Sequence, residues 1–133
     1  MLIRDGLEAM AGAGCTITAV HWRAVYDGVT LTVKSRVDID HIVPLGNAWA
    51  SGASTWTRAR RVRFTNDLDE PQLIAVSASS NRSKGDRGPE EWKPRRQRVW
   101  CLDARWWVDV KTVWPLTVTG DEKRALRSMP ETC

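Results

Sequence analysis

The segment 37–44, Val-Asp-Ile-Asp-His-Ile-Val-Pro, constrains the fold more than any other part of the sequence. Apolar and polar residues alternate along it, which is typical of a β-strand that buries one face. Proline cannot donate a hydrogen bond to a neighbouring strand, so the strand should end before Pro44. We expect the core face to carry Val37, Ile39 and Ile42, and the outward face to carry Asp38 and Asp40.

Two other regions have strand-like patterns. Residues 15–20 and 29–33 alternate in the same way around the turn residues 26–28, and they predict an antiparallel hairpin. Residues 73–76 are apolar and follow Pro71, which predicts a second core strand.

Helices are predicted elsewhere, and the fold class is therefore α+β. They are two short pieces within residues 45–64, a short helix from near Asn81 with Ser79 or Ser80 as N-cap, residues 99–113, and a final helix after Thr119. Thr119 lies three residues before Glu122, which is the capping-box spacing.

The size and composition predict one domain over residues 1–133. The chain is 42% hydrophobic and 27% charged, as in ordinary globular domains. It has eight tryptophans, whose large indoles should supply much of the core. We assign Trp49, Trp56, Trp92, Trp100, Trp106, Trp107 and Trp114 to packing.

No apolar run approaches the ~20 residues that a membrane span needs, so we expect no membrane partner. No secretory signal is visible, which leaves localisation open between an intracellular or phage-encoded protein and an exported protein that lacks its N-terminus. The cysteines are Cys15, Cys101 and Cys133, without zinc-site spacing, and one pair plus one leftover thiol is the simplest account.

Basic residues are concentrated in two runs. The net charge of the chain is +4, and residues 82–98 alone carry seven basic and three acidic residues, a net of +4. A second run, residues 58–63, contains four arginines. Two such runs beside one polar region favour nucleic acid as the partner, although a solvated helix face is the alternative.

Polar residues with catalytic chemistry follow the two central strands. Asp40 and His41 end one strand, Asn66 precedes the next, and Asn81 opens the helix after it. A carboxylate can hold a hard divalent cation while a neighbouring imidazole takes a proton from water, and both are needed for phosphodiester hydrolysis. Asn81 could add a neutral oxygen ligand. Such ligands suit Mg²⁺ or Mn²⁺ better than Zn²⁺.

These residues carry a resemblance to the HNH endonucleases. Residues 38–45, 66–68 and 81–86 look like that family, in particular the branch of small bacterial and phage nucleases and the C-terminal domain of GmrSD-type restriction enzymes. Residues 47–53, 91–94 and the tail from 101 to 133 look like the same branch. The resemblance implies a ββα-metal core at about residues 36–90, with the N-terminal hairpin and the C-terminal helices around it.

The resemblance also implies residue roles. Asp40 and Asn81 would bind the metal, His41 would be the general base, and Asn66 would brace the catalytic loop. Arg82 or Lys84 would contact phosphate, with ordinary surface charges as the alternative. Asn47 competes with Asn66 as the middle asparagine, and we favour Asn66. Cys101 and Cys133 would form a disulfide, leaving Cys15 unpaired.

The sequence therefore predicts a metal-dependent endonuclease that hydrolyses DNA with His41 as general base. The expected metal is Mg²⁺, with Mn²⁺ as the alternative. The alternative is a non-catalytic nucleic-acid-binding module derived from such a nuclease. Cleavage specificity, the choice between DNA and RNA and the oligomeric state stay open.

Overall fold

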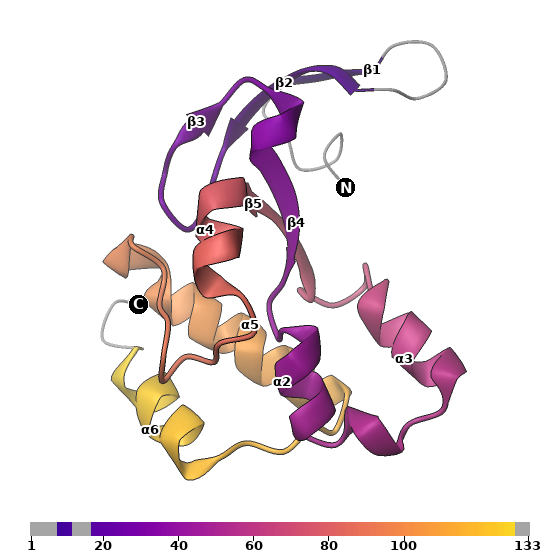
Figure 1. Ribbon diagram of the computed structural model, residues 1–133. Coiled ribbons are helices and arrows are strands. Elements are labelled where there is room, and N and C mark those ends of the chain that lie inside the picture. Colours follow the sequence, from indigo (N-terminus) through magenta and orange to yellow (C-terminus); the bar gives the residue numbers. More distant parts are fainter. Residues whose placement is uncertain (1–7, 12–16, 130–133) are drawn as a thin grey trace.

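The computed structural model describes residues 8–11 and 17–129. Within them the chain is a mixed α and β structure with two antiparallel sheets, as predicted. Figure 1 shows the sheet β1–β3 at one end and helices α2, α3 and α6 at the other, with the pair β4–β5 between them.

The N-terminal sheet has the order β1-β2-β3 and contains the predicted hairpin. β2 (Ile17–Arg23) pairs with the two-residue strand β3 (Thr30–Leu31), and the additional strand β1 (Glu8–Ala11) pairs with the other edge of β2. Cys15, where the hairpin was expected to begin, lies outside the described residues. The turn between β2 and β3 includes Asp27.

The second sheet is formed by the two predicted central strands. β4 (Val37–His41) follows the 3-10 turn η2 (Lys34–Arg36) and pairs antiparallel with β5 (Leu73–Ser77), so that His41 lies opposite Leu73. Between them come α2 (Leu45–Ala50), η3 (Ala53–Thr55) and α3 (Arg58–Thr65), which confirm the prediction of two short helices with a break.

The expected orientation of β4 is wrong. Asp40 is 4% exposed and points inward, whereas Ile39 is 39% exposed. The alternation was read correctly, but the opposite face is buried, because a tyrosine and a lysine from other elements compensate the aspartate. These partners are described with the site below.

The helix that carries Asn81 begins earlier than predicted. α4 (Ala78–Lys84) has Ser77 as its N-cap, and the Ser77 hydroxyl accepts from the backbone of Ser80. Asn81 is therefore in the middle of the helix. The helix ends at Gly85, whose φ of +55° strains any other residue.

Two helices complete the core. α5 (Trp100–Val113) follows η4 (Gln97–Val99), and α6 (Gly120–Ser128) starts with the predicted capping box of Thr119 and Glu122. Most tryptophans pack on the core as expected, but Trp49 does not, since it is 54% exposed. No helix in the described ranges is both long and apolar enough to span a membrane.

Candidate functional site

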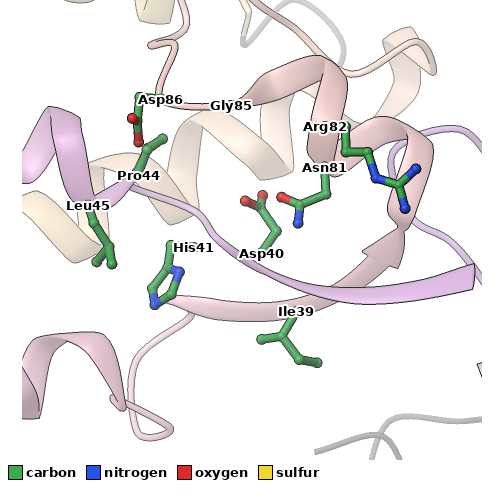
Figure 2. Close-up of a pocket in the computed structure, with 9 residues that line it drawn as sticks. All are labelled: Ile39, Asp40, His41, Pro44, Leu45, Asn81, Arg82, Gly85 and Asp86. Carbon is green, nitrogen blue, oxygen red and sulfur yellow. The ribbon is translucent and has the colours of Figure 1, made fainter. Parts of the chain in front are cut away.

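A cavity of about 310 Å³ lies where the end of β4, the start of α2 and the helix α4 meet. Figure 2 shows its lining. The residues are Ile39, Asp40, His41, Pro44, Leu45, Asn81, Arg82, Gly85 and Asp86. Asp40, His41 and Asn81, which are separated by up to 41 positions in the sequence, are thus brought together by the pairing of β4 with β5 and by α4 directly after it.

Asp40 is fixed through one of its two oxygens. Its Oδ2 accepts from the Tyr26 hydroxyl at 2.8 Å and from the Lys84 ammonium at 2.6 Å. Burial, and next the charge of Asp40, raise the pKa of Tyr26 well above its usual value, so the phenol stays protonated and donates. Within the described residues Oδ1 accepts no hydrogen bond, which leaves it available to a ligand.

We expected Lys84 at the surface, either in contact with phosphate or as an ordinary surface charge, but the structure buries it. It is 3% exposed, and its ammonium donates to Asp40 and to the backbone carbonyl oxygens of His41 at 2.7 Å and Ile42 at 3.0 Å. All three ammonium hydrogens therefore have acceptors. Lys84 ties α4 to the end of β4 instead of facing solvent.

Asn81 is oriented by Asp38. The Asn81 amide Nδ2 donates to Asp38 Oδ2 at 3.2 Å, and this fixes which way the amide faces. In Figure 2 the amide oxygen of Asn81 is on the side of the Asp40 carboxylate. Two oxygens, one charged and one neutral, thus face the same space without another hydrogen bond from the described part of the chain.

The His41 ring is held by a backbone carbonyl. Its Nε2 lies 3.0 Å from Thr65 O, and a carbonyl can only accept, so Nε2 carries the hydrogen. In the neutral ring Nδ1 then has the free lone pair. Figure 2 shows this second nitrogen on the side of the ring toward Asp40. The ring thereby directs a nitrogen lone pair toward Asp40 and the cavity.

The chain after His41 is also fixed. Ile42 N donates to Gln72 O at 2.8 Å, and the buried Gln72 side chain exchanges two hydrogen bonds with the backbone of Val43. The amide of Gln72 thus continues the β4–β5 ladder beyond the strand ends. The backbone that carries Asp40 and His41 is rigid as a result.

Neither candidate for the middle asparagine lines this cavity. Asn66 is exposed at the C-terminus of α3, where its Nδ2 donates to Val62 O at 2.8 Å, and it lines a different cavity. Asn47 accepts from Ser51 within α2. The contact to His41 comes instead from the carbonyl of Thr65, the residue before Asn66.

A second carboxyl lies beneath the site. Asp103 on α5 is buried, and burial raises its pKa to about 6, against the opposing effect of the Lys84 ammonium. The charge of Asp40 raises the same pKa further. Tyr26, Asp40, Lys84 and Asp103 therefore form one buried polar cluster below the cavity.

Asp27 anchors the start of α4. Its Oδ2 accepts from the hydroxyls of Ser77 at 2.5 Å and Ser80 at 2.9 Å. Burial acts to raise the pKa of Asp27, but these hydrogen bonds and that from Val29 outweigh it and lower the pKa. The turn after β2 thus sets the position of the helix that presents Asn81.

Basic side chains reach the surface beside the cavity. Arg82 is exposed and lines both this cavity and an adjacent one of about 280 Å³ with Ser35, Arg36 and Ser79. Arg58 and Arg63 on α3 are also exposed. Both predicted basic runs therefore contribute exposed arginines, whereas Lys84 of the second run is buried.

Several supporting residues had no signal in the sequence. Tyr26, Asp38 and Asp103 are ordinary residues of a turn, a strand and a helix, and Thr65 acts through its backbone. Only the Asp-x-Asp-His spacing at residues 38–41 hinted that Asp38 shares a face with Asp40.

The donor set can be tested against the predicted metal. No group of three or more His, Cys, Asp and Glu side chains in the described ranges could hold a metal ion. The oxygens of Asp40 and Asn81 would leave most positions of an octahedral ion to water and phosphate, which suits Mg²⁺. Since sulfur and multiple imidazoles are missing from the cavity lining, the set does not suit structural zinc.

Comparison with known proteins assigns the chain to a class of nuclease-related domains. It matches the GmrSD restriction endonucleases, C-terminal domain, over residues 15–129. The chain belongs to this family, and the resemblance found in the sequence is confirmed.

A relative from Arthroderma benhamiae (strain ATCC MYA-4681 / CBS 112371) is named "Uncharacterized secreted protein". It is 52% identical over 133 residues, which cover 100% of this chain and 65% of the relative. The chain thus spans less than two thirds of that relative's length. No solved structure matches the chain.

Proposed function

We propose that this domain is a metal-dependent endonuclease that hydrolyses phosphodiester bonds of nucleic acid, DNA in the first instance. The observation that carries the proposal is the single cavity onto which β4 and α4 present an oriented imidazole and two free oxygens. In this proposal β4, β5 and α4 are the ββα-metal core, and Asp40 and Asn81 hold a divalent cation, preferably Mg²⁺. Bound there, the cation would stabilise negative charge on the phosphate in the transition state.

His41 is the general base in this proposal. Its Nδ1 takes a proton from the attacking water, and the Nε2 hydrogen bond to Thr65 O keeps the ring in the required tautomer and orientation. When the ring becomes protonated, Thr65 O still accepts from Nε2, so no rearrangement is needed. Arg82, exposed at the rim, holds the phosphate. The products would carry 5′-phosphate and 3′-hydroxyl ends.

A disulfide and the name of the relative support a place outside the reducing cytosol. Cys101 is disulfide-bonded, although Cys15 and Cys133 both lie outside the described residues. Disulfides persist mainly in oxidising compartments. The name of the relative says that it is secreted. We therefore include export in the proposal.

The test is plasmid nicking by His41→Ala during a magnesium titration. If the imidazole only moves a proton in the transition state, turnover should fall by roughly 10²- to 10⁴-fold while affinity for DNA stays unchanged. Excess magnesium should not restore it, because no cation supplies the missing base.

Asn81→Ala is the matched variant. It removes an oxygen ligand, so it should raise the magnesium concentration needed for half-maximal nicking and be partly rescued by excess magnesium. Circular dichroism checks that both variants fold. Full activity of His41→Ala would exclude this mechanism, and a parent protein that binds DNA without cutting it would favour the non-catalytic module.

A further inference from the structure

Trp49 is the exposed tryptophan of α2, and its position is unusual for so large an apolar side chain. It is 54% exposed, whereas the other described tryptophans are buried or half-buried. An indole of this size leaves much apolar area in water, and a contact with a ligand would cover it.

The indole is continuous with the candidate active site. Leu45, which lines the cavity, is 43% exposed and lies four residues before Trp49 in α2. Residues four apart lie on the same face of a helix, about 6 Å along its axis. The two side chains therefore form one apolar stripe that leads away from the cavity.

α3 completes the surface from the other side. The Arg61 guanidinium lies over the Trp49 ring at 5.4 Å from its centroid and is held by a hydrogen bond to Trp56 O at 2.5 Å. Arg61 is four residues before Thr65, whose carbonyl binds His41. Trp49 is thus one turn of α2 from the cavity-lining Leu45, and Arg61 is one turn of α3 from the carbonyl that contacts His41. Figure 1 shows α2 and α3 on the same side of the β4–β5 pair.

The chemistry of this surface fits a nucleobase. With the Arg61 guanidinium over one face, the other face of the exposed indole is a platform on which any base can stack. The exposed Arg58 and Arg63 on the same helix as Arg61 provide positive charge for the backbone. In an intact duplex the base faces are covered by their neighbours and are not available.

We infer that Trp49, supported by Arg61, is a base-stacking subsite, and that the proposed nuclease prefers nucleic acid whose bases are unpaired at this position. This inference rests on the proposed function for the location of the scissile phosphate. The subsite holds a base near that phosphate, because Leu45 joins Trp49 to the cavity.

The test measures binding of the whole chain by fluorescence anisotropy in EDTA, so that no cleavage is needed. The probes are a labelled 12-nucleotide single strand and a labelled hairpin duplex of the same sequence. Trp49→Ala should weaken binding of the single strand by roughly 5- to 150-fold and leave the duplex nearly unchanged. Trp49→Phe should retain most of the affinity. Arg105→Ala, at an exposed arginine of α5, is the control and should behave as the parent.

An abasic scan of the single strand locates the subsite. Removing one base at a time should cost the parent most at a single position, and Trp49→Ala should abolish that difference. Equal losses on both probes would mean a general effect on fold or charge and would overturn the inference. Unchanged affinity for both would also overturn it.

The two proposals fail separately. If binding depends on Trp49 but no divalent cation supports cleavage, the nuclease proposal fails and the single-strand binding site stands. If the parent cleaves with a divalent cation but its affinity does not depend on Trp49, the nuclease proposal stands and the stacking subsite is excluded.

Discussion

At the scale of single residues, orientation of an amide is the least obvious requirement of the site. Asn81 can present its oxygen to a cation only if its nitrogen is satisfied elsewhere, and Asp38 Oδ2 provides that acceptor at 3.2 Å. Mutation of a residue that orients a metal ligand typically lowers metal affinity or activity by about 10- to 100-fold. Asp38 is therefore a positioning residue in our proposal.

Asp38→Ala should raise the Mg²⁺ concentration for half-maximal cleavage by about 10- to 100-fold, because the amide loses its partner and rotates freely. Asp38→Asn keeps an acceptor oxygen and should stay close to the parent. Calorimetric titration with Mn²⁺ measures the same effect without turnover.

Asp109→Ala removes an exposed carboxylate of α5 and is the control for net charge. If Asp38→Asn is impaired as strongly as Asp38→Ala, the charge of Asp38 and not the orientation of Asn81 is what the site needs.

At the scale of elements, Lys84 determines how α4 meets β4. Its side chain is buried and makes an ion pair of 2.6 Å with Asp40, plus two hydrogen bonds to the β4 end. Removing one partner of a buried pair leaves the other charge uncompensated, which typically costs about 3–5 kcal/mol. The lysine is therefore expected to stabilise the fold and not to bind substrate.

Lys84→Met should lower the free energy of unfolding in urea by about 3–5 kcal/mol. The double variant Lys84→Met/Asp40→Asn should recover part of the loss, since neither charge of the ion pair remains. If Lys84→Met were as stable as the parent but bound DNA more weakly, the result would support the phosphate contact that the sequence predicted for Lys84.

At the scale of the whole molecule, Asp103 links stability to pH. Its pKa is raised from 3.8 to about 6, so the folded protein binds more protons than the unfolded chain between these values. Its contribution to stability is thus fully present below about pH 4 and is lost as the pH rises toward about 6. Lys84, Asp40 and Tyr26 are the ionisable groups of the same cluster.

Asp103→Asn should remove this dependence, and above pH 7 it should be more stable than the parent by up to about 3 kcal/mol. Urea unfolding of both proteins at a series of pH values from 4 to 8 is the measurement. The difference between the two curves isolates Asp103 from other titrating groups. Parallel curves would show that Asp103 does not retain its proton on folding.

The exposed arginines predict how steeply the affinity for nucleic acid falls with salt concentration. For roughly five phosphate contacts, log K against log salt should slope near −4 to −5 on duplex DNA and near −3.5 on a single strand. Arg58→Ala and Arg63→Ala should each reduce the slope by about 1. Arg127→Ala on α6 should not change it. A flat salt profile would exclude a phosphate-tracking surface.

The sequence by itself determined where strands and helices lie and which residues of the motif could share a site. Local signals were sufficient there: alternation for β4 and β5, the break near Gly52, and the capping box at Thr119. The start of α4 was misplaced, because several serines in a row can cap and their sequence does not show that Ser77 is the one whose hydroxyl accepts from the backbone of Ser80.

Only the tertiary structure decided which face of β4 is buried. Alternation shows that Asp38 and Asp40 share a face, but an aspartate is buried only where distant residues compensate its charge. Here they are Tyr26, 14 residues before Asp40, and Lys84, 44 residues after it. Distant partners likewise decided that Lys84 is buried, and that the Thr65 carbonyl rather than an asparagine side chain contacts His41. The exposure of Trp49 was also visible only in the structure.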